Sequence, residues 1–367
     1  MKDLSGISVV LPSLDPDEKL HAVIDGLLEV GFSHIILIND GSKPENMHYF
    51  YDAAAAHPEI TLLHHAVNRG KGAALKTAFN WFLVNRPEGF GVITVDGDNQ
   101  HHKLDCRACA EHLLETGRLT LGVRDFSQKD VPARSSFGNK TTSAVFKVFV
   151  GMTISDTQTG LRAISREDMK TLLGVEGDRF EYETNMLLAM KAKNIPFDEV
   201  KIRTVYIEEN ASSHFHPIRD SWRIYKLILV HFFQYTIVSL LSALIDNGLY
   251  ALLTSILSGT LLGTALTVAC TAGARVASSL FNFYMNKKVV FQSKVSTGAA
   301  LLRYYCLALP MLAAQALLTQ GVYVLLGIGD HQTGLRTLIY AVVMTVLYIV
   351  SYMFQQRWVF APEKNKK

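Results

Sequence analysis

The sequence predicts two successive domains: an α/β domain with a doubly wound, mostly parallel sheet over residues 1–226, and an all-α membrane domain of four helices over residues 227–362. Before residue 227, short apolar runs alternate with helical stretches, which is typical of βαβ units. After it come four apolar stretches near the roughly 20 residues that cross a bilayer. The 367 residues suffice for both domains.

In the first part, apolar segments of strand length are expected at 7–13, 34–40, 60–66, 91–98, 119–125 and 200–207. Helical stretches such as 18–31 and 71–85 separate them. Ligands of doubly wound sheets bind beyond the carboxyl ends of the strands. The polar residues at those ends are therefore the candidates for a site: Pro12, Ser13, Asn39, Asp40, Asp96, Asp98 and Arg124.

The segment V-D-G-D-N-Q-H follows the fourth of these strands. Asp96, Asp98 and Gln100 alternate along it, so an extended backbone would direct all three side-chain oxygens to one face. Hard oxygen ligands suit Mg²⁺ or Mn²⁺ beside a diphosphate. The alternative is a solvated acidic turn, but the position directly after a buried strand favours the metal.

Seven motifs follow one another in this part: V-V-L-P-S, I-N-D-G-S, N-R-G-K-G-A-A-L, V-D-G-D-N-Q-H, G-V-R, D-T-Q-T-G-L-R and F-E-Y-E-T-N-M-L. Over residues 7–225 their order resembles family 2 glycosyltransferases of the GT-A fold, in particular the polyprenyl-phosphate (dolichyl-phosphate) mannose and glucose synthases. The resemblance implies metal-dependent transfer of a hexose from a nucleotide-sugar to a polyprenyl phosphate such as undecaprenyl phosphate, for cell-envelope glycans. Direct displacement would invert the anomeric centre and give a β-linked product.

The resemblance also implies roles for single residues. Pro12, Ser13 and Asp40 would line the base and ribose pocket, and Asp96 would reach the ribose or base as well as the metal. Asp98 and Gln100 would hold the metal on the diphosphate. Lys71, at a helix start where free N–H groups favour anions, would bind the nucleotide-sugar, or is only a solvated helix-end charge. Arg124 and Arg134 match positions that bind the acceptor phosphate, and Asp156 the position proposed as base, or a turn-capping residue.

Three departures from the family pattern stand in this sequence. Leu14-Asp15 replaces the usual Tyr-Asn, and Asn39 replaces the first Asp of D-D-G-S. The late R-x-x-G-x-S-K segment becomes residues 210–214, and His214 is expected to take over a phosphate contact with a charge that varies near neutral pH. Residues 212–227 are expected to form an amphipathic helix at the membrane interface that delivers the acceptor phosphate, or merely an anchor helix.

The four spans are expected at Leu229–Leu257, Leu261–Tyr284, Leu302–Leu326 and Leu335–Met353. Lys and Arg gather before the first span, between the second and third, and after the fourth. The positive-inside rule then places both termini in the cytoplasm, at the inner (plasma) membrane. Because residues 1–6 are polar and lead into a strand, no signal peptide is expected, and the first domain should stay cytoplasmic.

A weak internal repeat relates the ends of the second and fourth spans, with Phe291 and Phe360 in register. Two helical hairpins in the same orientation would produce it. The ending N-F-x-x-N-K-x-x-V-F resembles the GtrA-like family of small membrane proteins over residues 225–360. Asp246 and Arg275 lie inside spans. They are either a binding site or pathway for a lipid phosphate or a structural ion pair, and the sequence does not decide.

Other classes fit less well. The net charge of +3 does not indicate nucleic acid, and Cys106 and Cys109 are i,i+3 on an expected helix instead of a zinc or redox pair. A processive polysaccharide synthase would carry Q-x-x-R-W, but Phe354 stands where the Gln belongs. The membrane half acting as a flippase for the glycolipid stays open. So do a homo-oligomer and the choice among UDP-glucose, GDP-mannose and a UDP-N-acetylhexosamine.

Overall fold

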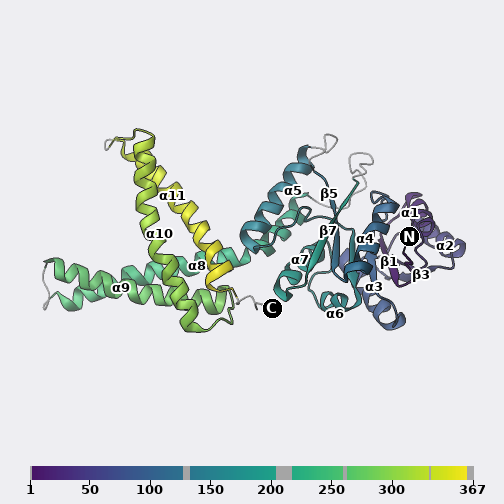
Figure 1. Ribbon diagram of the computed structural model, residues 1–367, viewed down its shortest axis with the longest axis horizontal. Coiled ribbons are helices and arrows are strands. Elements are labelled where there is room, and N and C mark those ends of the chain that lie inside the picture. Colours follow the sequence, from purple (N-terminus) through teal and green to yellow (C-terminus); the bar gives the residue numbers. More distant parts are fainter. Residues whose placement is uncertain (1, 127–132, 204–216, 259–262, 330–331, 362–367) are drawn as a thin grey trace. The chain divides into compact units, whose positions relative to one another are not determined.

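The computed structural model describes residues 2–126, 133–203, 217–258, 263–329 and 332–361 (Figure 1). The chain separates into two compact units, Met1–Leu227 and Ile228–Lys367. Each unit has its own core, and they are described in turn.

The first unit is built on a seven-stranded sheet with the order β3-β2-β1-β4-β6-β5-β7. Neighbouring strands are parallel except where β6 pairs with β4 and β5. This confirms the predicted doubly wound, mostly parallel sheet. The strands are β1 (Ile7–Ser13), β2 (Ile35–Asn39), β3 (Ile60–His64), β4 (Gly91–Thr94), β5 (Leu119–Arg124), β6 (Arg162–Ser165) and β7 (Phe197–Ile202).

Strand β6 was not expected from the sequence. It has only four residues and begins with Arg162, whose side chain is fully buried, so no apolar run marks it. The Arg162 guanidinium donates hydrogen bonds to the backbone carbonyl oxygens of Thr159 and Glu183. These bonds offset part of the cost of burying its charge. Because β6 is antiparallel, the segment that precedes it arrives at the carboxyl ends of β4 and β5.

Helices separate most of the strands and cover the sheet (Figure 1). They are α1 (Lys19–Glu29), α2 (Met47–Ala56), α3 (Lys71–Asn85), α4 (Lys103–Thr116), α5 (Ala133–Val145), α6 (Arg166–Leu173) and α7 (Glu181–Lys193). Cys106 and Cys109 lie on the buried face of α4 and belong to the main apolar core. Burial raises the pKa of both thiols, that of Cys109 to about 12, so both are packing residues.

The second unit contains four long helices: α8 (Pro217–Leu257), α9 (Gly263–Met285), α10 (Thr297–Leu325) and α11 (Thr333–Phe354). Helix α8 begins in the first unit. Each of the four is long and apolar enough to cross a membrane, which confirms the predicted four-helix region. The expected interfacial helix over 212–227 is not a separate element, because 217–226 form the first turns of α8, and 212–216 lie outside the described residues.

The two hairpins, α8–α9 and α10–α11, meet at one end and diverge from it (Figure 1). At that end α9 and α11 each continue into a π-helical turn, η4 (Asn286–Val290) and η5 (Gln355–Val359). Phe291 and Phe360 close these turns and stack on each other, with ring centroids 5.2 Å apart. The residues that the repeat places in register are thus structurally equivalent.

Candidate functional site

The carboxyl ends of the central strands bring most of the expected site residues to one edge of the sheet. Ser13 pairs with Asn39 where β1 and β2 end, and Thr94 pairs with Arg162 where β4 ends and β6 begins. The segment 156–160, directly before β6, therefore lies beside the segment 95–100 that follows β4. The Thr94 hydroxyl fixes this contact by donating to the Gly160 carbonyl oxygen at 2.6 Å.

The segment after β4 is a turn and not the extended strand that the alternation of Asp96, Asp98 and Gln100 led us to expect. Regular strand structure ends at Thr94, and Asn99 has a φ of 60°. The Asp98 carboxylate accepts a hydrogen bond from the Gln100 N–H at 3.1 Å, which closes the turn. The extended backbone on which that expectation rested is therefore absent, and a shared face for the three oxygens stays a prediction.

Lys71, the first residue of α3, bridges two carboxylates. Its Nζ lies 2.8 Å from Asp96 Oδ1 and 3.0 Å from Glu183 Oε1, and all three side chains are largely buried. Burial alone would lower the pKa of the Lys71 ammonium, but the two carboxylates outweigh it and raise that pKa. Lys71 is thus a fixed positive charge inside the site, not a solvated helix-end charge.

Gly70 makes this placement possible. Its φ is +100°, and a Cβ there would lie 2.5 Å from the Asp178 carbonyl oxygen. Asp40 holds the same turn from the other side, because its carboxylate accepts from the N–H groups of Arg69 and Gly70 at 3.0 and 2.7 Å. Asp40 Oδ1 also lies 2.6 Å from His65 Nδ1. In this structure Asp40 therefore positions the turn that carries Lys71, and its predicted contact with the nucleotide stays a prediction.

Asp96 and Asp98 have opposite electrostatic environments. Burial alone would raise the pKa of Asp96, but the Lys71 ammonium and His101 lower it below its ordinary value. Burial and the neighbouring Asp96 charge raise the pKa of Asp98. Asp98 is thus a desolvated carboxyl group beside a like charge, and among the described residues it has no ion pair as close as the one between Asp96 and Lys71.

A divalent cation fits this donor set. Within the described residues, no group of three or more His, Cys, Asp and Glu side chains would hold a metal ion by itself. Mg²⁺, however, is bound through one or two carboxylates together with substrate phosphates and water. A cation at Asp98 would relieve the repulsion from Asp96, so the residues present fit an ion whose remaining ligands come from a diphosphate.

Asp156 is fully buried and paired with Arg124, which ends β5. The Arg124 Nε and Nη2 donate to the two Asp156 oxygens at 2.7 and 3.1 Å, a bidentate pair. Asn139 on α5 clamps the flanks of Asp156: its amide donates to the Ser155 carbonyl oxygen at 2.6 Å, and its oxygen accepts from the Thr157 N–H at 3.3 Å. Arg124, predicted to bind the acceptor phosphate, and Asp156, predicted as the base, are thus joined directly.

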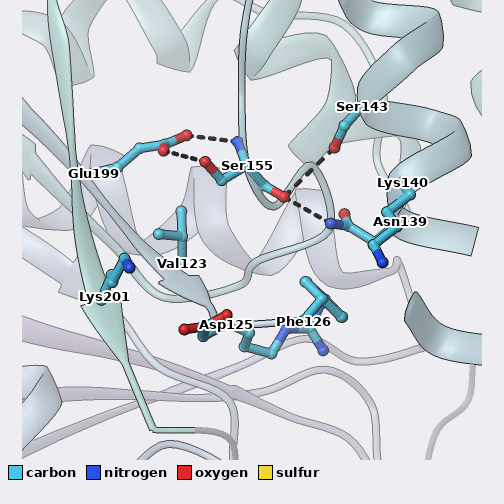
Figure 2. A pocket seen from close by; sticks show the side chains of 10 residues that line it. Val123, Asp125, Phe126, Asn139, Lys140, Ser143, Ser155, Glu199 and Lys201 are labelled. Atoms are coloured by element: carbon cyan, nitrogen blue, oxygen red, sulfur yellow. Dashed lines mark hydrogen bonds between the residues drawn. The ribbon is translucent and has the colours of Figure 1, made fainter. Parts of the chain in front are cut away.

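A cavity of about 480 Å³ opens beside this pair. Figure 2 shows Glu199 on β7 and Asn139 converging on Ser155, with Lys140 and Lys201 at opposite sides. Glu199 accepts from the Ser155 N–H and hydroxyl at 2.7 and 2.6 Å. The cavity is lined by Val123, Arg124, Asp125, Phe126, Asn139, Lys140, Ser143, Ser155, Glu199 and Lys201. Three of these are cationic and two, Asp125 and Glu199, are anionic, so the lining has an excess of one positive charge, which suits an anionic ligand.

The remaining predicted site residues have mixed outcomes. Pro12 is half-buried, and Ser13 Oγ is buried with no hydrogen-bond partner among the described residues, as is His101 Nδ1. Arg134 lies in α5, but its side chain is outside the described residues, and so is His214. Sequence reasoning missed Glu183, His65, Asn139 and Glu199. Glu183 stood within the quoted F-E-Y-E-T-N-M-L motif, whereas the other three carry no local signal.

Comparison with known proteins identifies both units. Residues 8–173 match Glycosyl transferase family 2, and residues 234–360 match the GtrA/DPMS transmembrane domain. The chain therefore carries a family 2 glycosyltransferase domain followed by a GtrA/DPMS transmembrane domain. Both resemblances drawn from the motifs are confirmed.

Three curated proteins are similar to this chain in sequence. The uncharacterized protein MJ1222 of Methanocaldococcus jannaschii is 28% identical, over 62% of this chain and 93% of its own. A UDP-N-acetylglucosamine–dolichyl-phosphate N-acetylglucosaminyltransferase of Methanococcus voltae is 22% identical, over 55% and 86%. A dolichyl-phosphate β-glucosyltransferase, ALG5D, of Trichomonas vaginalis is 20% identical, over 55% and 66%.

Proposed function

We propose that this protein transfers a hexose or N-acetylhexosamine from a nucleotide-sugar to a polyprenyl phosphate, with inversion at the anomeric carbon. The observation that carries the proposal is the meeting of two clusters at one sheet edge of a glycosyltransferase domain. One is the Lys71–Asp96 pair with Asp98, and the other is the Arg124–Asp156 pair. Two of the relatives are named for transfer of a sugar to dolichyl phosphate.

In this proposal the donor binds over the ends of β1 and β4. The unpartnered Ser13 hydroxyl and Pro12 line the base and ribose pocket, while Lys71 lies near the diphosphate. Asp98, with Gln100 and Asp96, holds Mg²⁺ or Mn²⁺. When bound, the ion would neutralise charge on the departing nucleoside diphosphate. Lys71 would stabilise the same negative charge, and because Lys71 is buried, its electrostatic interaction with the diphosphate would be stronger than in water.

The acceptor phosphate is assigned to Arg124, with Arg134 and His214 as further candidates. Lys140 and Lys201 line opposite sides of the adjacent cavity and add positive charge there. Asp156 need not remove a proton, because a lipid phosphate is already largely ionised near neutral pH, its second pKa being about 6. Its two oxygens instead fix the guanidinium of Arg124. A phosphate oxygen then forms a bond to the anomeric carbon as the bond from that carbon to the diphosphate oxygen breaks.

We place the catalytic unit and both termini on the cytoplasmic side of the inner membrane. The support is the distribution of positive charge: Lys287, Lys288, Lys294 and Arg303 follow α9 on one side, whereas 258–260 carry none. Since polyprenyl phosphate presents its headgroup at a membrane surface, this topology puts donor and acceptor in the same compartment. The boundary between the two domains remains proposed at residues 226 and 227.

The test uses the full chain in membranes, a panel of radiolabelled nucleotide-sugars and undecaprenyl phosphate, with Mg²⁺, Mn²⁺ or EDTA. We expect Asp98→Asn to lower metal-dependent transfer at least about 100-fold. Asp52→Asn on the exposed face of α2 is the matched control and should transfer at the wild-type rate. Wild-type metal-dependent transfer by Asp98→Asn would refute the metal assignment. A wild-type protein that glycosylates the acceptor from none of the donors would refute the proposed function.

A further inference from the structure

The membrane unit contains a two-fold internal repeat at the level of individual hydrogen bonds. Tyr235 on α8 lies 3.3 Å from Ser351 on α11 and accepts from Gln355 at 3.0 Å. The residues 69 positions away make the corresponding cluster. Tyr304 on α10 lies 3.1 Å from Asn282 on α9, and Asn282 accepts from Asn286 at 2.8 Å. Asn286 and Gln355, themselves 69 residues apart, meet at 3.3 Å where the two clusters join.

Each cluster connects the first helix of one hairpin to the second helix of the other. The two hairpins are therefore equivalent copies. Near η4 and η5, each hairpin forms the same kind of polar contact with the other. Such contacts hold helices together in a bilayer, where the hydrophobic effect does not. The chain thus supplies its own comparison, because each residue of one hairpin can be set against its counterpart 69 positions away in the other.

The repeat breaks near the middle of the spans. Asp246 on α8 has Gln315 as its counterpart on α10, and Arg275 on α9 has Met344 on α11. In the first copy Asp246 pairs with Arg275 at 3.1 Å and accepts from Ser278 at 2.9 Å. In the second copy, a neutral hydrogen bond from Gln315 to Tyr340 at 2.8 Å joins the two helices. A hairpin of this fold therefore needs no charges at this level.

Charges inside a span are costly. Since the fold does not require this pair, the cost indicates a ligand. Both Asp246 oxygens are engaged by protein donors, and the Asp246 side chain is 20% exposed. The Arg275 side chain is 72% exposed, so its pairing with Asp246 leaves most of it uncovered by the described residues. The pair presents donors outward, and the partner of an arginine fork is a carboxylate or phosphate.

We propose that Arg275, fixed by Asp246, is a binding site inside the membrane unit for the phosphate group of an isoprenoid lipid. The choice of this lipid rests on the proposed function, because a polyprenyl phosphate and its glycosylated product carry an anion on a chain that partitions into the bilayer. Bulk phospholipid and free phosphate share the chemistry, and the test separates them.

The test is photolabelling of the full chain in nanodiscs with an isoprenyl phosphate that carries a diazirine beside the phosphate, read by peptide mass spectrometry. In the wild type we expect labelled peptides around Asp246 and Arg275. The double variant Asp246→Gln, Arg275→Met installs the second copy's residues and should therefore insert. It should lose at least tenfold of this label. Gln315→Ala is the matched control in the other hairpin and should label as the wild type does.

Asp246→Asn separates binding from packing. It keeps a hydrogen-bond acceptor for Arg275 but removes the competing negative charge, so labelling should be maintained or increased. Unlabelled isoprenyl phosphate should compete, whereas the isoprenol, inorganic phosphate and phosphatidylglycerol should not. Undiminished labelling of the double variant, or equal competition by any of the other three, would overturn the proposal. Absence of sugar transfer in the wild type, with this labelling pattern intact, would instead refute only the catalytic function.

Discussion

Gly160 is the position where the smallest change should have the largest effect on the site. It precedes β6 and faces the Lys71–Asp96 pair. A Cβ at this residue would lie 3.1 Å from both Asp96 Cγ and Lys71 Nζ, and closer still to Asp96 Oδ2. In Gly160→Ala the Asp96 carboxylate has to move away from the new Cβ by about 1 Å. A misplacement of that size lowers the rate about 100-fold. This corresponds to about 2.7 kcal/mol of transition-state stabilisation.

The assay is kcat/KM for sugar transfer in membranes, with urea denaturation to show that the variant is folded. Gly174→Ala is the matched control: it lies at the exposed end of α6, has a φ of −82°, and its Cβ would meet only the Thr171 carbonyl oxygen, at 3.7 Å. It should leave kcat/KM within about twofold. A folded Gly160→Ala protein with wild-type kcat/KM would show that the position of Asp96 does not limit turnover.

Three further predictions concern two substitutions in the site and one buried thiol of the core. Lys71→Met leaves the Asp96 carboxylate buried and unpaired and should cost about 3 kcal/mol of unfolding free energy. In the wild type the pKa of Asp96 lies below its ordinary 3.8, so its contribution to stability is lost as the pH falls from that ordinary value through the lowered one. In the variant burial is no longer opposed by Lys71, so the pKa of Asp96 should rise and acidification should neutralise the unpaired charge. Urea titrations followed by fluorescence should therefore show the stability difference between the two proteins shrinking as the pH falls, and a difference independent of pH would contradict this. Asn139→Ala should lower kcat about tenfold with an unchanged KM for the nucleotide-sugar, because it loosens only the flanks of Asp156; a change confined to KM would argue otherwise. Cys109, with its raised pKa, should resist iodoacetamide at pH 8 until urea unfolds the chain, and peptide mass spectrometry of native samples should find it unmodified.

The sequence was sufficient for features that depend on local pattern. Apolar runs and periodicity predicted β1 and α3 with the bounds that the structure has, and the four spans followed from length and hydropathy. The ends of parallel strands also placed Ser13 and Asp96 at one edge, since that edge is common to all of them.

Features that depend on tertiary contacts were not predictable. The antiparallel β6 is stabilised by long-range contacts of Arg162 and Thr94, so no local periodicity marks it. The turn at Asp98 depends on a left-handed Asn99, which alternation alone cannot indicate. Glu183 reaches Lys71 from a helix more than a hundred residues away, and only the fold brings the two together.

The reversed direction of β6 has a consequence for how such a site can diversify. Because this strand returns toward β4, the chain between residues 95 and 161 begins and ends at the same edge of the sheet. Substitutions or changes of length within 125–155, the stretch that contributes Asn139 and Lys140 to the cavity, therefore leave both anchored ends in register. Under the proposed function, the acceptor side of the site can change in evolution while the donor side keeps its geometry.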